Sequence, residues 1–243
     1  MITRIRMLPW VQYKSRIAQN PTVIIPTGAV EVYGPHLPMG TDLYVADALA
    51  EAVARKTGAL IAPTVELGES MGLTSFDETF TLSPAVLQGY LDELFAKLVR
   101  DGFKNFLFLT GHAGNVPIIS YLVTKYLHQY DIKCAQVDVW RFLQTHSGDV
   151  LDNRGYMAHG HASECGTSMM LYLHPELVDK SAITKTDPGP AGAGFTDFIT
   201  YRRLKNRTAI ALSGDAESAT AEKGEKLFHI AVERILTFME ENF

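Results

Sequence analysis

Carboxylate and imidazole side chains crowd into one short stretch of the sequence, EVYGPHLPMGTD at residues 31–42. Asp, Glu and His supply the oxygen and nitrogen ligands that suit Zn, Mn or Fe. Glu31 and Asp42 are well separated along the chain, so only a folded loop brings them together, and the intervening prolines and glycines supply the turns. The stretch is therefore either an ordinary surface loop or half of a metal site.

Two further polar clusters carry the same residue types. His112 lies between glycines in LTGHAGN, where the backbone can approach a ligand closely. His159, His161 and Glu164 lie in HGHASECGTS, just before an apolar helical run. A single loop histidine is more often a hydrogen-bonded structural group than a ligand. Because several such clusters occur, most of them directly after predicted strands, together they indicate a site.

The elements that position these residues alternate between strands and helices. Apolar runs predict buried strands of a covered parallel sheet at 22–28, 59–67, 105–111, 133–140 and 208–212. Helices are predicted from apolar periodicity or alanine content at 43–57, 84–100, 115–130 and around 228–239. The alternation predicts an α/β fold with a mostly parallel sheet and helices on both faces. Ligands of such sheets bind at the carboxyl ends of the strands, where the polar clusters fall.

Composition bounds the class of protein. The chain has 243 residues, 47% hydrophobic and 20% charged, which fits one globular domain over residues 1–243. A net charge of −5 without a long Lys or Arg run argues against nucleic acid as a partner. Neither a signal peptide nor a membrane-spanning apolar run is recognisable. Cys134 and Cys165 are far apart, which suits a reducing compartment, so we expect a cytoplasmic protein.

Four blocks of sequence, in order, resemble the creatininase (creatinine amidohydrolase) family. They are IPTGAVEVYGPHLPMGTD, LTGHAGN, GHASECGTSMML and SGDAESATAEKGEKLF, with a weaker fifth match at ETFTLS. The resemblance implies a three-layer α/β/α sandwich and a metal-dependent hydrolase, usually a homohexamer. Members of the family open cyclic amides or hydrolyse formamides at a centre of one or two divalent ions, for which we expect Zn, Mn or Fe.

The resemblance also assigns roles to individual residues. Glu31, Asp42 and His112 match metal ligands, and Glu164 matches a candidate ligand of a second ion. His161 matches the histidine proposed to act on the substrate. These are largely the residues that the loop chemistry had already singled out.

The sequence departs from the family around this site. Tyr33 stands where a metal-binding histidine is usual, and Gly166 replaces a glutamate often found before Thr-Ser. A neutral phenol is a poor ligand, since its unperturbed pKa is about 10. Either Tyr33 coordinates as a phenolate, or His36 reaches in, or the protein uses one ion; alternatively Tyr33 simply packs against the loop. We expect Tyr33, His36 and His159 to contact substrate, although His159 could instead only orient its neighbour.

The resulting hypothesis is hydrolysis of a small cyclic or N-formyl amide by metal-activated water. His161 has the more suitable unperturbed pKa for carrying the proton, with Glu164 as the other candidate. The alternative is ring-opening carbon–carbon hydrolysis of a cyclic polyhydroxy diketone, as in the inosose hydrolases of inositol catabolism. A non-catalytic binding or assembly protein is a further alternative. The Gly- and Pro-rich segment 185–206 is either a substrate-covering loop or a surface loop that contacts another subunit.

Overall fold

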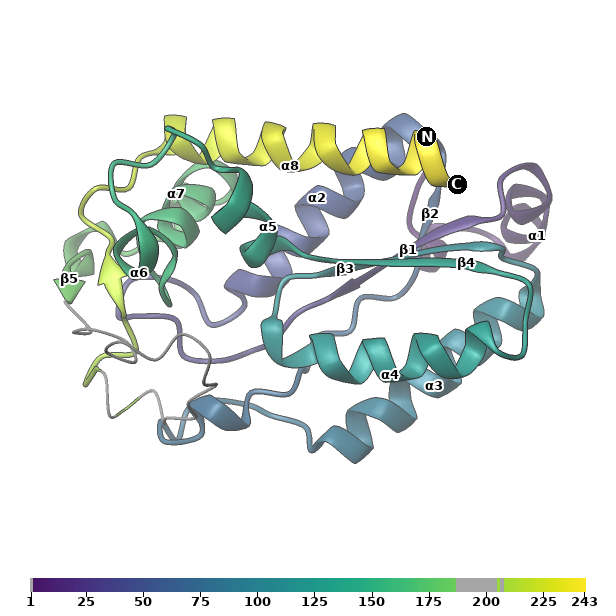
Figure 1. The fold of residues 1–243 in the computed structure, drawn as a ribbon, viewed down its shortest axis with the longest axis horizontal. Helices are drawn as coiled ribbons and strands as arrows, with labels where there is room; N and C mark the ends of the chain where they lie inside the picture. The colour runs from purple at the N-terminus through teal and green to yellow at the C-terminus, as the bar shows by residue number, and fades with distance from the viewer. Residues whose placement is uncertain (1, 187–204, 206–207) are drawn as a thin grey trace.

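A parallel four-stranded sheet forms the centre of the protein, with the strand order β2-β1-β3-β4 (Figure 1). The structure is a computed structural model that describes residues 2–186, 205 and 208–243. The strands are β1 (Thr22–Thr27), β2 (Leu60–Ile61), β3 (Asn105–Thr110) and β4 (Lys133–Asp138). A short antiparallel pair, β5 (Lys185–Thr186) and β6 (Gly214–Asp215), lies apart from this sheet.

Helices cover both faces of the sheet, which makes three layers (Figure 1). They are α1 (Trp10–Gln19), α2 (Thr41–Thr57), α3 (Pro84–Asp101), α4 (Val116–Leu127), α5 (Val139–His146), α6 (Gly155–His159), α7 (Glu164–Leu173) and α8 (Ala221–Asn242). Helices α2, α5, α7 and α8 share one apolar core, and α1, α3 and α4 share the other. Within the described ranges, no helix is long and apolar enough to cross a membrane.

The two cores explain the apolar runs of the central strands β1 and β3. Successive side chains of a strand point to opposite faces. In β1, Ile24 packs into the core of α2 and α8, whereas Val23 and Ile25 pack into the core of α3 and α4. In β3, Leu107 and Phe108 divide in the same way. Burial on both faces therefore requires apolar residues at every position.

Local sequence signals set the ends of the helices. Helix α3 begins at Pro84, whose fixed φ suits the first helical turn, and ends at Gly102, whose φ is +104°. Its buried residues, Leu87, Leu91 and Phe95, repeat at the spacing of one helix face. The predicted helix at 84–100 is therefore confirmed almost to the residue.

The predicted α/β fold is confirmed, and two of the five predicted strands need correction. The run 59–67 contributes the short strand Leu60–Ile61 and an isolated bridge from Val65 to Thr27 of β1. The run 208–212 is not a strand: the Ala211 carbonyl accepts from the Gly34 amide, and the backbone of Ala211 is left-handed with φ 51°. Ala211 and Leu212 are buried, whereas Ala209 and Ile210 are exposed, and the run forms no ladder with a neighbouring strand. Most of segment 185–206 lies outside the described residues.

The order of the strands opens a crevice above β1 and β3. The chain leaves β1 into α2 on one face of the sheet, and it leaves β3 into α4 on the other face (Figure 1). Loops that diverge in this way leave space between them at the carboxyl ends of the two strands. The first two polar clusters of the sequence lie at this point.

Candidate metal centre

Glu31, Asp42 and His112 converge at the carboxyl ends of β1 and β3. One ligand atom from each lies within 4.8 Å of the others, and they form the only group of three or more acidic, His or Cys ligands found among the described residues. Glu31 follows β1, Asp42 lies in the first turn of α2, and His112 follows β3. Their exposed fractions are 2%, 1% and 7%. The three predicted ligands are thus brought together and shielded from water.

The imidazole of His112 is oriented so that Nδ1 faces the two carboxylates. Nδ1 lies 3.0 Å from Asp42 Oδ2 and 3.4 Å from Glu31 Oε2, while Nε2 lies 2.7 Å from the carbonyl oxygen of Glu69. A carbonyl only accepts, so Nε2 carries the hydrogen and donates it. Nδ1 is then the atom that remains available to bind a metal, an arrangement typical of ligating histidines.

A glycine allows this contact. A Cβ on Gly114 would overlap the carbonyl oxygen of Glu69 and crowd Nε2 of His112. Gly114 lies in the LTGHAGN block, whose glycines the sequence already marked as places where the backbone comes close to another group. Because Gly114 has no side chain, His112 can lie close to the 69–70 segment.

Two residues that the sequence did not single out hold the carboxylates. The Ser70 hydroxyl donates to Glu31 Oε2 at 2.6 Å, and the Trp140 indole N–H donates to Asp42 Oδ1 at 3.0 Å. Trp140 is the second residue of α5, but the predicted strand 133–140 included it, so the sequence did not place it beyond the end of a strand. Ser70 and Glu69 lie in irregular structure, and Glu69 acts through its backbone, so no side-chain pattern identifies them.

The charges of the cluster are strongly coupled. Burial alone would lower the pKa of His112, but Glu31 and the hydrogen bond to Asp42 outweigh it and raise that pKa to about 10. For Glu31, a carboxylate, burial raises the pKa, whereas His112 and the Ser70 hydroxyl act to lower it. Two buried carboxylates therefore require a compensating cation, which is a proton on His112 or a metal ion.

This donor set fits a divalent ion. Two carboxylates and one imidazole with a backbone-oriented ring are ligands of Zn, Mn or Fe, and three protein ligands leave a coordination position for water or substrate. The neighbouring Ser70 and Trp140 hydrogen bonds fix the carboxylate orientations. The sequence prediction of a metal-binding group at Glu31, Asp42 and His112 thus has the geometry it requires.

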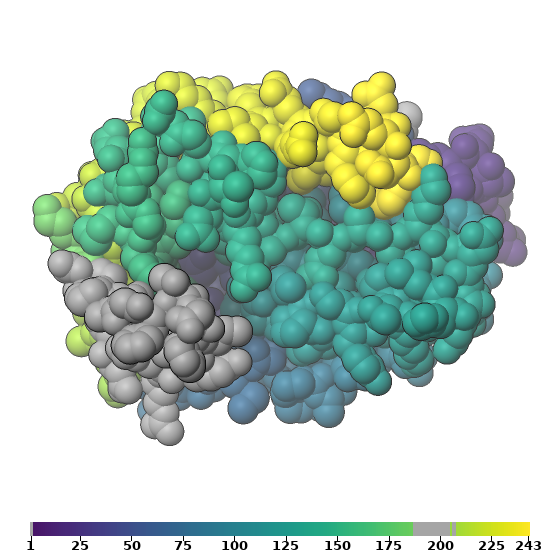
Figure 2. Space-filling view, viewed as in Figure 1, coloured from purple at the N-terminus to yellow at the C-terminus, as the bar shows by residue number. Residues whose placement is uncertain are grey.

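A small cavity of about 150 Å³ opens beside this cluster. It is lined by Tyr33, Trp140, His159, Gly160, His161, Cys165 and Gly166. Figure 2 shows the surface hollowed next to the green atoms of the segment around residues 140–165, with purple atoms of the early chain at depth. Tyr33 and Trp140 belong both to this cavity and to the surroundings of Asp42, so the cavity and the metal-binding group are contiguous.

His161 presents one defined nitrogen to this cavity region. Its Nε2 lies 2.7 Å from the carbonyl oxygen of Val32, so Nε2 donates and Nδ1 is the atom able to take up a proton. Burial lowers the pKa of His161, with Glu31 acting weakly in the opposite direction, so the ring is neutral near pH 7. The next residue, Ala162, has φ 58°, a strained conformation for alanine that fixes the turn into α7.

Tyr33 packs within the site. Its exposed fraction is 6%, its ring lies 4.3 Å from that of His161 between centroids, and its hydroxyl is hydrogen-bonded to Asp42. Burial, with the negative charges of Asp42 and Glu31 in second place, raises the pKa of Tyr33 well above its usual range. In the metal-free protein the phenol is thus neutral and donates to Asp42.

The other two expected substrate contacts lie in different places. His159 lines the cavity, where its Nδ1 is buried without a hydrogen-bond partner in the described structure. His36 is 2% exposed, and its Nε2 pairs with the Thr167 hydroxyl at 2.8 Å instead of joining the metal-binding group. Burial lowers the pKa of His36 to about 4. The structure therefore brings His159 to the cavity but not His36.

Glu164 is bound elsewhere. Its carboxylate accepts from the amides of Asp152 and Asn153 at 2.9 and 3.0 Å, and Lys223 Nζ lies at 2.6 Å. Burial alone would raise the pKa of Glu164, but the Lys223 hydrogen bond and the two amides lower it. All of these partners are structural, so the expected metal and proton-transfer roles of Glu164 gain no support from the geometry.

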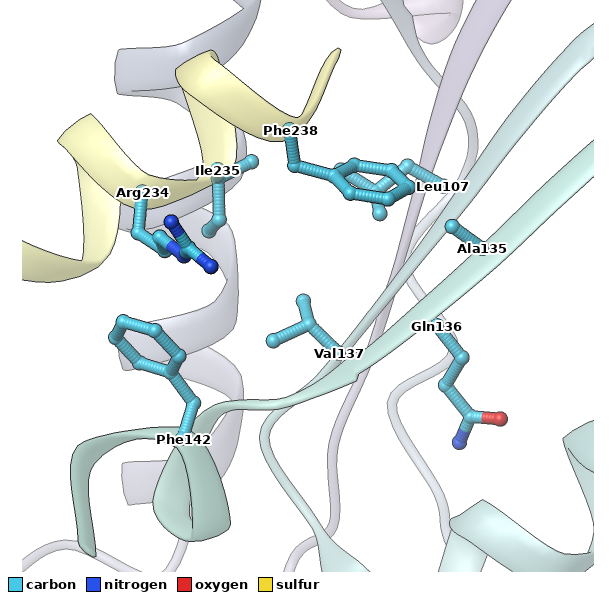
Figure 3. Close-up of a pocket in the computed structure, with 8 residues that line it drawn as sticks. All are labelled: Leu107, Ala135, Gln136, Val137, Phe142, Arg234, Ile235 and Phe238. Carbon is cyan, nitrogen blue, oxygen red and sulfur yellow. The ribbon is translucent and has the colours of Figure 1, made fainter. Parts of the chain in front are cut away.

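A second cavity of about 190 Å³ lies between β4, α5 and α8 (Figure 3). It is lined by Leu107, Ala135, Gln136, Val137, Phe142, Arg234, Ile235 and Phe238. Val137 and Ala135 face Ile235 and Phe238 across it, and Arg234 is the only charged lining residue (Figure 3). Because it lacks grouped polar side chains, this cavity has no means to activate a substrate.

The fold and the metal-binding group together define a metal-dependent hydrolase of the α/β class. The chain belongs to the creatininase family (creatinine amidohydrolase), whose sequence profile matches residues 6–239. It is 28% identical to creatinine amidohydrolase from Pseudomonas putida over 97% of this chain and 95% of that protein. The chain is therefore a metal-dependent hydrolase of this family.

Other relatives carry different names. A mycofactocin precursor peptide peptidase from Mycolicibacterium smegmatis is 27% identical over 86% of this chain and 80% of that protein. A 3-dehydro-scyllo-inosose hydrolase from Thermotoga maritima is 24% identical over 95% of this chain and 79% of that protein. The family thus includes hydrolases with unlike substrates.

Solved structures agree with the fold. A manganese form of creatininase superposes with a TM-score of 0.87 at 25% identity, covering 99% of this chain and 98% of that one. A creatininase variant described as Zn-Zn type gives 0.86 at 25% identity with the same coverage. These structural neighbours are zinc or manganese forms, which agrees with the buried Glu, Asp and His group of this chain.

Proposed function

We propose that this protein hydrolyses the carbon–nitrogen bond of a small cyclic or N-formyl amide. One observation carries the proposal: a buried group of Glu31, Asp42 and His112 lies next to a small cavity that is lined by His161. The metal-binding group and the proton carrier required for amide hydrolysis thus share one site. Family membership supports the same reaction type.

Glu31, Asp42 and His112 would hold the divalent ion, for which the neighbouring structures favour Zn or Mn. When bound, such an ion lowers the pKa of water and polarises a substrate carbonyl. The contribution of the protein is to fix the donors: Glu69 orients His112, and Ser70 orients Glu31.

His161 is the proton carrier of the proposal. Nε2 is committed to the Val32 carbonyl, so a proton taken from water resides on Nδ1 and passes from there to the leaving nitrogen. The lowered pKa of His161 keeps Nδ1 unprotonated at the start of the reaction. Acid–base help of this kind accelerates a reaction roughly 100- to 10,000-fold.

The cavity favours a small substrate. Its volume of about 150 Å³ is well below the roughly 300–1,000 Å³ of pockets that hold drug-sized ligands. Aromatic rings of Tyr33 and Trp140 supply flat walls, and the buried, unpartnered Nδ1 of His159 offers a polar contact. A small planar amide with a polar edge matches these features.

A second candidate is ring-opening carbon–carbon hydrolysis of a cyclic polyhydroxy diketone in inositol catabolism. The similarity to an inosose hydrolase and the polar groups of the cavity support it. Both candidates need the same water activation, and they differ in whether nitrogen or carbon receives the proton. A non-catalytic role conflicts with family membership and with the buried Glu, Asp and His donor group of this chain.

We also propose that the protein acts in the cytoplasm as a homo-oligomer, a hexamer by family resemblance. Its two cysteines are unpaired, which suits a reducing compartment. Helix α1 exposes Trp10 and Val11, with exposed fractions of 70% and 59%, and these are candidate subunit contacts. Light scattering of the purified protein tests this assembly.

The deciding experiment compares zinc- and manganese-loaded protein on creatinine, simple formamides and a cyclic polyhydroxy diketone. We expect turnover of an amide, loss of it in His161→Ala with metal content unchanged, and no loss in His128→Ala, which changes an exposed residue of the helix end. Turnover of the diketone alone would select the second candidate. Activity that persists after metal removal would contradict both.

A further inference from the structure

Tyr33 and Gly166 are neighbours beside Asp42. Tyr33 belongs to the loop after β1, and Gly166 lies in the first turn of α7. A Cβ built on Gly166 would lie 3.6 Å from the ring carbon Cε1 of Tyr33 and 4.0 Å from its hydroxyl oxygen. The phenol of Tyr33 therefore extends along the space that a longer side chain at 166 would enter. Tyr33 and Gly166, the two departures from the family pattern, are thus in contact in the structure.

The phenol of Tyr33 is covered on three sides. Its hydroxyl is bonded to Asp42, its ring faces that of His161 at 4.3 Å, and Gly166 borders its edge. A carboxylate only accepts, so the Tyr33 hydroxyl is the donor of the bond to Asp42. A hydrogen-bond donor thus lies beside the Asp42 carboxylate.

A second ion beside Asp42 would need donors near Tyr33. Two-metal hydrolytic sites hold their ions about 3.5–4 Å apart, and each zinc ion commonly takes about four ligands. Here Gly166 has no side chain, and Nε2 of His161 is engaged by Val32. Glu164, two residues before Gly166, is held by Lys223. In the described part of the chain, no second group of three His, Cys, Asp or Glu ligands exists.

We infer that this centre binds one ion per chain, because the hydroxyl of Tyr33 takes the place of a second cation at Asp42 and Gly166 leaves room for its ring. This inference rests on the proposed metal-dependent function. Tyr33 is then a positioning residue: it fixes the Asp42 carboxylate, and its ring forms a wall of the cavity. With one ion, a single Lewis acid would polarise the substrate carbonyl, and protein side chains would carry the proton.

The first test counts metal and does not depend on activity. Metal-free protein is titrated with zinc, gel-filtered and analysed by elemental mass spectrometry, while ultraviolet difference spectra report tyrosinate formation. We expect one zinc per chain and no tyrosinate signal. Two zinc ions per wild-type chain would overturn the inference and leave the proposed function intact. A tyrosinate signal that disappears in Tyr33→Phe would also overturn it, because Tyr33 would then be a ligand.

The outcome that rejects the proposed function is different. Wild-type protein that takes up no zinc or manganese at any concentration tested would reject metal-dependent hydrolysis itself, and the inference with it. One ion per chain without turnover of any substrate would support the inference and leave only the substrate class wrong. The two failures are therefore distinguishable.

A gain-of-binding variant tests the two positions directly. Tyr33→His combined with Gly166→Glu removes the phenol and supplies an imidazole and a carboxylate beside Asp42. We expect zinc content to rise from one to two per chain. The matched control is Tyr33→His combined with Gly89→Glu, because Gly89 is exposed on α3 and a Cβ there meets nothing. The control should stay at one ion. Equal zinc content in both variants would overturn the inference that Tyr33 and Gly166 together exclude a second ion beside Asp42.

Discussion

At the scale of single residues, the donors around the ligands decide how well a metal is held. Ser70 is 1% exposed and donates to Glu31 Oε2 at 2.6 Å, so it selects one orientation of that carboxylate. Without the hydroxyl, Glu31 keeps its charge but loses this constraint. Hydrogen bonds to metal ligands typically contribute 10- to 100-fold to metal affinity.

We therefore expect Ser70→Ala to weaken zinc binding about 10- to 100-fold while the fold persists. Competition with a chromogenic chelator measures the affinity, and circular dichroism checks the fold. Ser120→Ala is the matched control, since Ser120 is exposed on α4 and remote from the ligands. Equal zinc affinity in Ser70→Ala and wild-type protein would show that Glu31 is oriented without Ser70.

The buried side chain of His36 makes the stability of the fold depend on pH. Burial lowers its pKa to about 4 from an unfolded value of 6.5, with a weak opposing effect of Asp179. Between these values the unfolded chain binds a proton at this residue and the folded chain does not. The contribution of His36 to stability is therefore complete above pH 6.5 and is lost as the pH falls toward 4.

We expect His36→Asn to reduce the loss of unfolding free energy between pH 7 and pH 4.5. Urea unfolding of metal-free protein at both pH values measures it, and the exposed His128→Asn serves as the control. An unchanged pH dependence in His36→Asn would mean that the imidazole becomes protonated in the folded protein without cost.

At the scale of elements, the sequence predicts what depends on local pattern. The apolar runs of β1 and β3 and the stripe of α3 determine their own structure, because burial on two faces or on one helix face leaves a distinct periodicity. The run 208–212 has the same composition as a strand. Its Ala211 carbonyl instead accepts from the Gly34 amide, and its Leu212 carbonyl accepts from the Thr186 hydroxyl. These are tertiary contacts that no local pattern predicts.

The site divides in the same way. The sequence predicts the three ligands Glu31, Asp42 and His112, because their residue types suit a metal and they follow predicted strands. The carbonyl of Glu69 and the hydroxyl of Ser70 were not, because irregular segments carry no periodicity. Glu164 was assigned to metal through the family resemblance, and only the structure reveals Lys223, the cation that binds it.

The ammonium group of Lys223 links three parts of the chain. Lys223 in α8 reaches Glu164 in α7 and Asp152 in the preceding loop, and the Glu164 side chain is fully buried. Removing one partner of a buried ion pair leaves an uncompensated charge, which typically costs about 3–5 kcal/mol. We expect Lys223→Met to lower the unfolding free energy by about 3 kcal/mol, with zinc stoichiometry unchanged.

The measurement is urea unfolding combined with elemental analysis of the folded protein. Lys226→Met, on the exposed side of α8, is the control, and adding Glu164→Gln to Lys223→Met should restore part of the stability. If Glu164→Gln alone removed bound zinc, Glu164 would be a metal ligand and the structural role would be refuted.

At the scale of the whole molecule, the metal-binding group connects segments that belong to different layers. Asp42 lies in the first turn of α2 on one face of the sheet, while His112 precedes α4 on the other face. The 69–70 segment contacts both Glu31 and His112. A proton on His112 partly balances the two carboxylates in the absence of metal. A divalent ion balances them fully and links the layers through one centre.

Binding to the folded chain alone must therefore stabilise the whole fold. At a free zinc concentration 100 times the dissociation constant, linkage predicts a gain of about 2.7 kcal/mol in unfolding free energy. Urea unfolding with zinc buffered at this level, compared with chelator-treated protein, measures the gain. His112→Ala should lose the zinc dependence, whereas the exposed His128→Ala should retain it. Wild-type stability that is indifferent to zinc would mean that the ion binds unfolded chains as well, or that these three side chains do not form its site.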